Sequence, residues 1–218
     1  MRKKIIAGNW KMNKTVDDAI DLSSSIMRDY ADCTGVDIVL CPPFTAIKSI
    51  SDVVSDSQIQ IGAQNMYYED SGAFTGEISA PMLKDLFVKY VIIGHSERRE
   101  LLKENDAIIN KKVTKALEKK LVPILCVGET LTERESDFTK DVVGKQLEKG
   151  LLNISPENYS DLVIAYEPVW AIGTGKTATA DQAQDVHKFI RDEIERFAGN
   201  AAASSVRIQY GGSMKPNN

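Results

Sequence analysis

The sequence predicts an α/β fold of parallel strands and, within that class, a (β/α)8 barrel. Short apolar runs typical of buried strands alternate with segments of helical periodicity, at intervals of roughly 20 to 40 residues. No GxGxxG motif follows the first predicted strand, which disfavours a dinucleotide-binding fold. Polar, chemically reactive side chains recur where predicted strands end, and in a barrel all these ends meet at one mouth. These side chains are Lys11, His95, Glu129, Glu167 and Ser213.

The first half of the chain reads as strands that are each followed by a helix or a loop. The strands are predicted at residues 4–7, 36–40, 59–63 and 90–93. A helix is predicted to begin after Thr15, whose hydroxyl can form a capping box with Asp18. Further helices are expected at about 44–54 and 80–87. The segment 64–77 is instead a long loop with aromatic residues among glycines and acidic residues.

The second half continues the alternation. Its strands are predicted at residues 122–127, 162–165 and 206–209. One helix is expected around 105–119, and a charged segment with a second helix runs to about 152. A third helix should begin after Thr179, which can form a capping box with Gln182.

The number of strands bears on how much of a barrel is present. About seven strands are predicted, whereas a closed barrel of this type has eight and about 250 residues. The sequence ends at Asn218, just where an eighth unit would begin. We therefore expect residues 1–218 to form a single barrel domain, truncated at its C-terminus and holding about seven of the eight β/α units.

Composition excludes several classes of protein. A hydrophobic content of 43% and a charged content of 27% are ordinary for a soluble globule. No apolar run approaches the roughly 18 residues of a membrane span, and the apolar stretch near the start is too short for a signal peptide. A formal charge of −4 argues against a nucleic-acid binder. Cys33, Cys41 and Cys126 are odd in number and lack CxxC spacing, so neither a disulfide framework nor a zinc site is indicated, and we expect a cytoplasmic protein.

The segment after the strand at 162–165 has the composition of a lid. Glu167 ends the strand, and the ring of Pro168 stiffens the exit from it. Four apolar residues and a glycine pair follow, which fits a flap that closes over a carboxylate and excludes water. A plain strand-to-helix connector is the alternative. The residues assigned to the lid are Pro168, Val169, Trp170, Ala171, Ile172, Gly173, Thr174, Gly175 and Lys176.

Two of the strand-end residues are suited to proton transfer. Glu167, beneath an apolar lid, is a candidate general base, although a solvated strand-end carboxylate is the simpler alternative. His95 comes just before Ser96, a plausible helix start, where the helix dipole favours a neutral ring that donates a hydrogen bond. His187 lies within a predicted helix and reads as an ordinary, partly exposed residue.

Other strand-end residues are suited to binding an anionic substrate. Lys11 supplies a cation and Asn9 an uncharged donor or acceptor. Gly173 and Ser213 can offer backbone N–H groups to a phosphate without a dedicated P-loop. No cluster of residues has metal-ligand spacing, and no Ser/His/Asp set is evident.

Five motifs taken together resemble the triosephosphate isomerase family. They are GNWKMN at 8–13, GAFTGE at 72–77, GHSERR at 94–99, AYEPVWAIGTGK at 165–176 and YGGS at 210–213. The resemblance runs from the first predicted strand to the last residue, and the motifs are highly specific in combination. It implies a TIM barrel and an isomerase of glycolysis and gluconeogenesis that interconverts dihydroxyacetone phosphate and D-glyceraldehyde 3-phosphate through an enediol(ate).

The resemblance also implies roles for individual residues. Glu167 would be the base, His95 the electrophile and Lys11 a further catalytic residue, a division of labour that is carried over from the family. The substrate-binding residues that it implies are Asn9, Lys11, Gly173 and Ser213. The supporting residues are Ser96, Glu97 and Cys126.

Partners and cofactors follow from the same resemblance. It implies a homodimer, with Thr75 of the loop 64–77 near the partner's active site, and exposed aromatic residues make that loop a natural interface. It implies no cofactor and no metal. The expected partner molecule is a small phosphorylated triose, with no role for nucleic acid or membrane.

The sequence departs from the family at its end. The family pattern continues past Ser213 into an eighth strand, whose loop carries a glycine pair that also binds phosphate. Two alternatives to an active isomerase therefore stay open. One is a catalytically incompetent barrel fragment, and the other is a Schiff-base aldolase of the same fold that uses Lys11.

Overall fold

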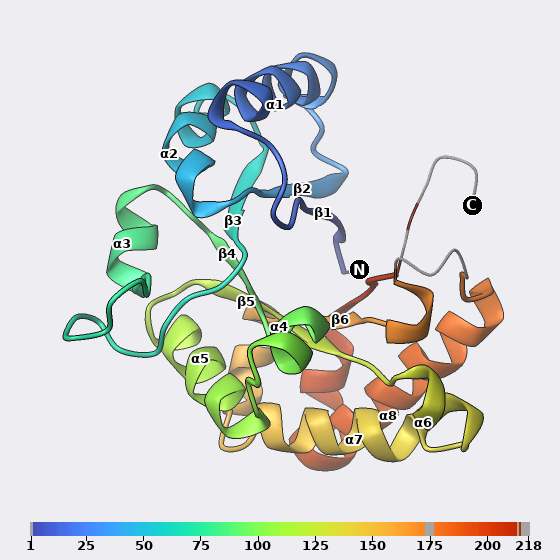
Figure 1. The fold of residues 1–218 in the computed structure, drawn as a ribbon. Helices are drawn as coiled ribbons and strands as arrows, with labels where there is room; N and C mark the ends of the chain where they lie inside the picture. Colours follow the sequence, from blue (N-terminus) through green and yellow to red (C-terminus); the bar gives the residue numbers. More distant parts are fainter. Residues whose placement is uncertain (1, 173–176, 213, 215–218) are drawn as a thin grey trace. The chain divides into compact units, whose positions relative to one another are not determined.

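The computed structural model describes residues 2–172, 177–212 and 214 (Figure 1). The chain divides into two compact units. The first unit is Met1–Ile93 with Lys115–Pro123, and the second is Gly94–Thr114 with Ile124–Asn218.

The first unit is built on parallel strands that pair in chain order. The strands are β1 (Lys4–Asn9), β2 (Val36–Cys41), β3 (Gln60–Ala63) and β4 (Tyr90–Ile93). β1 and β2 are in register from Lys4 opposite Val36 to Asn9 opposite Cys41, so that both run slightly beyond their predicted ends. β3 and β4 pair through Gly62 opposite Tyr90. A Cβ atom at Gly62 would lie only 2.4 Å from the sulfur of Cys41, so this close strand pairing requires glycine.

The helices of the first unit follow the predicted alternation. They are α1 (Val16–Tyr30), α2 (Phe44–Val53) and α3 (Ala80–Asp85). The capping box predicted for α1 is present, because the Asp18 N–H donates to the Thr15 hydroxyl while the Thr15 N–H donates to the Asp18 carboxylate. α5 (Asp106–Glu118) and β5 (Val122–Val127) each have residues in both units.

The second unit repeats the same arrangement. β6 (Val163–Tyr166) pairs in parallel with β5 from Ile124 opposite Val163 to Val127 opposite Tyr166, and with β7 (Arg207–Tyr210) along its other edge. The remaining elements of this unit are α4 (Ser96–Leu101), α6 (Leu131–Glu135), α7 (Thr139–Gly150), the 3-10 segments η1 (Pro156–Asp161) and η2 (Val169–Ala171), and α8 (Ala180–Ser205).

The core consists of strand residues covered by apolar helix faces. Every residue of β4 and β6 is buried, which is expected when parallel strands are covered on both faces. On the helices, α8 buries Val186, Ile190 and Ile194. The capping box predicted at the start of α8 is present between Thr179 and Gln182. The prediction of a parallel α/β fold is confirmed.

No helix among the described residues combines the length and the apolar character that crossing a bilayer requires.

Candidate functional site

Glu167 follows β6 directly and is held by backbone and side-chain contacts. Its N–H donates to the Val127 carbonyl at 2.7 Å, which extends the pairing of β5 and β6 by one residue. The residue is 5% exposed, and its carboxylate accepts a hydrogen bond from the Ser96 N–H at 3.1 Å. The alternative of a solvated strand-end carboxylate is therefore wrong, because this side chain is buried and hydrogen-bonded.

His95 lies against this carboxylate. Its Nε2 is 3.2 Å from Oε1 of Glu167, and its side chain is buried. Its Nδ1 accepts a hydrogen bond from the Glu97 N–H at 3.2 Å, which caps α4. The Glu97 carboxylate is 3.5 Å from the same nitrogen but 45% exposed, and the backbone N–H already occupies the Nδ1 lone pair. Because Nδ1 accepts this hydrogen bond, a neutral ring carries its proton on Nε2, and Nε2 faces Glu167 as a donor.

Hydrogen bonds and an ion pair of Arg99 hold the segment that contains His95. The Arg99 side chain donates to the Gly94 carbonyl at 2.7 Å and to the Cys126 carbonyl at 3.2 Å, and it pairs with Asp106 at 2.6 Å. Gly94 has φ of 74°, a left-handed conformation that suits glycine and turns the chain out of β4. Cys126, predicted as a supporting residue, thus contributes its backbone carbonyl, and its thiol is buried.

A buried charge cluster fixes the other end of α4. The Glu104 carboxylate accepts from Arg98 at 2.7 Å and from Lys112 at 2.6 Å, and Lys112 is 2% exposed. Burial works against the charge on Glu104, but the hydrogen bonds from Arg98 and Lys112 outweigh it and lower the pKa of Glu104.

Two glycines pack against Glu167. A Cβ atom at Gly128 would lie 1.7 Å from the Glu167 carbonyl oxygen, and one at Gly211 would lie 2.8 Å from the Glu167 Cγ. Both positions therefore exclude larger residues because the backbone and side chain of Glu167 occupy the space. The close packing of these glycines against Glu167 could not be predicted from the sequence.

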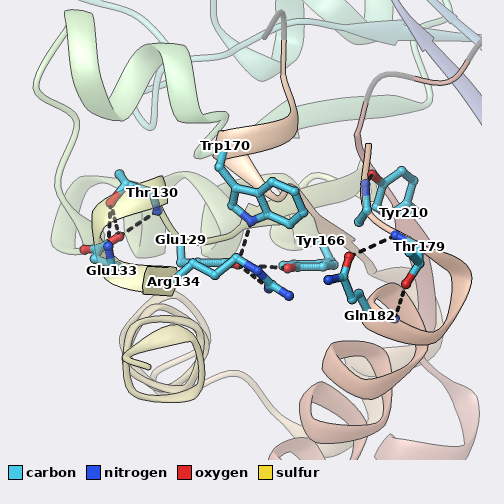
Figure 2. A network of polar contacts seen from close by, with 10 residues as sticks. Glu129, Thr130, Glu133, Arg134, Tyr166, Trp170, Thr179, Gln182 and Tyr210 are labelled. Atoms are coloured by element: carbon cyan, nitrogen blue, oxygen red, sulfur yellow. Dashed lines mark hydrogen bonds and ion pairs between the residues drawn. The ribbon is translucent and has the colours of Figure 1, made fainter. Parts of the chain in front are cut away.

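Glu129, predicted at the mouth with the other polar residues, is instead sequestered (Figure 2). It is 0% exposed, and its Oε1 accepts hydrogen bonds from the Tyr166 hydroxyl at 3.1 Å and from Trp170 Nε1 at 2.9 Å. Arg134 pairs with it at 3.1 Å and lies 4.6 Å from the Trp170 ring. Burial and the charge of Glu129 raise the pKa of Tyr166. Glu129 is an anchor for Trp170, which could not be predicted from the sequence because Tyr166 and Trp170 belong to a distant segment.

The first residues of the predicted lid are packed down rather than exposed. Val169–Ala171 form the 3-10 turn η2, in which Trp170 and Ala171 are buried. The Val169 N–H donates to the Glu129 carbonyl at 3.1 Å, so Glu129 holds this turn through its backbone as well as its side chain. Beyond the lid, the Ala178 N–H donates to the Tyr210 hydroxyl at 3.4 Å. The residues Gly173, Thr174, Gly175 and Lys176 lie outside the described residues, as does Ser213.

Trp170→Phe tests this anchor. The change removes the indole N–H while keeping most of the ring, and leaves the buried Glu129 carboxylate with one donor fewer. We expect the free energy of unfolding to fall by about 1.5–3 kcal/mol, the range for a hydrogen bond to a charged group. Denaturant unfolding measures the change. Trp10→Phe, at a half-buried tryptophan that directly follows β1, is the matched control. An equal loss in both variants would show that the Glu129 contact is not responsible.

In the first unit, the structure brings together Asn9, Lys11 and Gln64. Lys11 has φ of 54°, a left-handed backbone conformation that is costly for a lysine. Its N–H donates to the Asn9 side-chain oxygen at 3.0 Å, and the Gln64 side-chain amide donates to its carbonyl at 2.8 Å. The same Gln64 nitrogen donates to the Cys41 carbonyl at 2.9 Å. Both side chains thus hold the Lys11 backbone in a conformation that it would otherwise avoid.

The loop 64–77 carries a cluster of aromatic rings. Tyr67 stacks on Tyr68 with ring centroids 4.2 Å apart, and Phe74 lies 4.6 Å from Tyr67. Asp70 pairs with Lys119 at 2.5 Å, which ties the loop to the rest of the first unit. Thr75 is exposed.

The described part of the second unit contains a cavity of about 330 Å³ beside Glu167. It is lined by Gly94, Ser96, Arg99, Glu100, Cys126, Val127, Gly128, Thr130, Glu133, Gln146, Glu167 and Val169. Among the described residues there is no group of three or more metal-ligating side chains.

The comparisons with known proteins all identify the same family. A family model described as triosephosphate isomerase matches residues 4–218. Triosephosphate isomerase from Alkaliphilus metalliredigens (strain QYMF) is 56% identical over 218 residues, which cover 100% of this chain and 88% of the relative. The enzyme of the same name from Moorella thermoacetica is 53% identical over 100% of this chain and 87% of its own length. That from Clostridium tetani is 50% identical over 99% of this chain and 84% of its own length.

Proposed function

Because this chain belongs to the triosephosphate isomerase family, whose fold is the (β/α)8 barrel, we infer that it interconverts dihydroxyacetone phosphate and D-glyceraldehyde 3-phosphate. The reaction makes it an intramolecular oxidoreductase that acts on a small phosphorylated triose. The observation that carries the chemical part of this inference is the contact between Glu167 and His95, whose facing atoms are 3.2 Å apart in a buried setting.

Glu167 is proposed to be the base. Its carboxylate takes a proton from the substrate carbon next to the carbonyl and returns it to the former carbonyl carbon. The hydroxyl proton passes to the oxygen of the former carbonyl in the same interconversion, so that ketose becomes aldose. Both of its oxygens are already close to donors, Ser96 N–H and His95 Nε2. For Glu167 to reach the substrate, at least one of these contacts must break. Breaking the His95 contact also frees the His95 N–H to donate to the substrate.

His95 is proposed to be the electrophile. Once its Nε2–H no longer faces Glu167, it can donate to the substrate oxygen that gains charge as the enediolate forms. A neutral imidazole suits this role because it donates a hydrogen bond while its Nδ1 stays fixed by the Glu97 N–H. Ser96 supports the base through its N–H, and Glu97 supports the ring.

The remaining roles are carried over from the family motifs. Lys11 would stabilise the developing negative charge, and Asn9 and Lys11 would bind the substrate. Gly173 and Ser213 would contact the phosphate through backbone N–H groups, and residues 168–176 would close over the site. The left-handed backbone of Lys11, held by Asn9 and Gln64, supports a functional role, since such strain persists where the surroundings enforce it.

We propose that the molecule is one barrel domain that works as a homodimer in the cytoplasm, within glycolysis and gluconeogenesis. The aromatic loop 64–77, with Thr75 exposed on it, is the proposed contact between subunits. Charge supports a small-molecule partner, because a net charge of −4 does not favour binding to nucleic acid.

The reaction is tested by offering dihydroxyacetone phosphate to the chain in D2O. An isomerase that uses a carboxylate base will form glyceraldehyde 3-phosphate, detected by a coupled dehydrogenase, with deuterium from solvent at the carbon that receives the proton. Borohydride added during turnover separates the aldolase alternative, since only a Schiff base on Lys11 would be trapped as a covalent adduct. A trapped adduct, or a folded chain that forms no aldose phosphate, would overturn the proposal.

A further inference from the structure

We propose that Gln146 is a positioning residue for Glu167 and acts through Gly128. The inference rests on the proposed function, in which Glu167 is the base. Gln146 belongs to α7 and lies outside the five family motifs, and its side-chain hydrogen bonds within the described residues go to Gly128 rather than to Glu167 or His95.

The backbone of residues 127–129 runs alongside residues 167–169. The Glu167 N–H donates to the Val127 carbonyl at 2.7 Å, and the Val169 N–H donates to the Glu129 carbonyl at 3.1 Å. Along an extended strand, the polar groups of successive residues point to opposite sides. The N–H and carbonyl of Gly128 therefore face away from residues 167–169.

Gln146 satisfies both of these groups. The Gly128 N–H donates to Oε1 of Gln146 at 2.8 Å, and Nε2 of Gln146 donates to the Gly128 carbonyl at 3.2 Å. The carboxamide thus makes the two hydrogen bonds that a neighbouring strand would otherwise make to Gly128, just after the end of β5. It is carried on α7, a helix that is fixed in the core by the buried side chains of Val143 and Leu147.

Gly128 is packed so closely against Glu167 that its position cannot change alone. A Cβ atom at Gly128 would lie 1.7 Å from the Glu167 carbonyl oxygen and 2.6 Å from its carbonyl carbon. A shift of Gly128 toward Glu167 would displace that backbone, and a shift away would stretch the hydrogen bonds on both sides of it. A displacement of Gly128 therefore also displaces Glu167.

The cavity beside Glu167 explains why the restraint from Gln146 is needed. Gly128, Gln146 and Glu167 all line this space of about 330 Å³. Packed side chains hold a backbone in place, but an open volume lets it move. On this side of Gly128, the described hydrogen bonds that resist such movement are the pair made by Gln146.

Gln146→Met separates positioning from stability. Methionine keeps the length of the side chain but can neither donate to nor accept from Gly128. We expect kcat to fall about tenfold to a hundredfold, since a displacement near 1 Å can cost around a hundredfold, with KM within about twofold. Leu147→Val is the matched control on the same helix, because Leu147 is fully buried and faces the core. It should lower the thermal midpoint without lowering kcat at a temperature where it is folded. A kcat for Gln146→Met within about twofold of the unchanged protein overturns the inference.

Gln146→Glu adds a readout that a purely structural role would not move. A carboxylate can accept from the Gly128 N–H but repels the Gly128 carbonyl, whereas a protonated carboxylic acid can accept and donate as the amide does. The kcat of this variant, divided by that of the unchanged protein at the same pH, should therefore rise as the pH is lowered. The same ratio for Gln146→Met should stay flat. A flat ratio for both variants contradicts the proposed contact.

Amide hydrogen exchange tests the inference independently of activity. In Gln146→Met, exchange at the Gly128 and Glu167 amides should quicken at least tenfold relative to core amides of β6. In Leu147→Val these amides should change no more than the core does. If the unchanged protein had no isomerase activity, the proposed function would fail, while exchange at the Glu167 amide would still decide whether Gln146 holds it. Unaltered exchange at Glu167 in the methionine variant refutes the inference in either case.

Discussion

Glu167→Gln is expected to lower kcat by about 10²–10⁴-fold, the contribution of a well-placed general base. Glutamine has nearly the same shape and can still accept from the Ser96 N–H, but an amide cannot take a proton from carbon. Because the side chain is buried and its backbone bond to Val127 is unaffected, we expect the fold to be retained. Steady-state kinetics in both directions measures the loss.

Glu167→Asp is the control for this result. It keeps the carboxylate but withdraws it by about one methylene, and a misplacement near 1 Å costs around a hundredfold. Binding of an unreactive phosphorylated analogue should change far less than kcat in both variants. If either variant turned over substrate at the rate of the unchanged protein, another group would have to be the proton acceptor.

The fold could largely be predicted from the sequence because its signals are local. Buried parallel strands are short apolar runs, and the predicted bounds of Tyr90–Ile93 and Val122–Val127 match β4 and β5. The capping boxes at Thr15 and Thr179 are also local, since each needs only two side chains three residues apart. Where predicted ends differ, as at β1 and β2, strand pairing carries the extended backbone past the apolar run.

The candidate site was predictable in part. His95 and Glu167 stood out because rare or charged residues followed buried strands, and the structure brings them together with Ser96 and Glu97. The burial of Glu129 was not predictable in the same way. A glutamate at a strand end can face the mouth or turn back into the protein, and its choice depends on Trp170, Tyr166 and Arg134.

The roles of Gly128 and Gln146 were also hidden from the sequence. Glycine at a loop has many uses, and a glutamine on a helix is usually solvated. Only the placement of α7 beside the end of β5 shows that one carboxamide meets both polar groups of one glycine. The η2 turn was missed for a related reason, because its residues are ordered by hydrogen bonds to Glu129 rather than by local propensity.

His95→Asn is expected to lower kcat by about 10²–10³-fold, the typical loss when one donor to a developing oxyanion is removed. Asparagine can still donate a hydrogen bond, but its shorter side chain cannot reach the position of Nε2, which lies 3.2 Å from the Glu167 carboxylate. Its side-chain oxygen can replace Nδ1 as the acceptor for the Glu97 N–H, so the cap of α4 is kept while the donor at the Nε2 position is lost. The loss should therefore appear in kcat more than in KM.

The matched control for His95 is the other histidine of the sequence. His187 lies on α8, half-buried, with its ring edge-on to Tyr166 at 6.0 Å, and burial together with the charge of Arg191 lowers its pKa. His187→Gln should leave kcat within about twofold, because among the described residues Nε2 of this ring has no hydrogen-bond partner, and the lowered pKa keeps the ring uncharged at neutral pH. If His187→Gln lowered kcat as much as His95→Asn, the loss in both variants would be attributed to a disturbed fold rather than to the missing donor. If His95→Asn retained full activity, the electrophile would have to be Lys11 or Asn9.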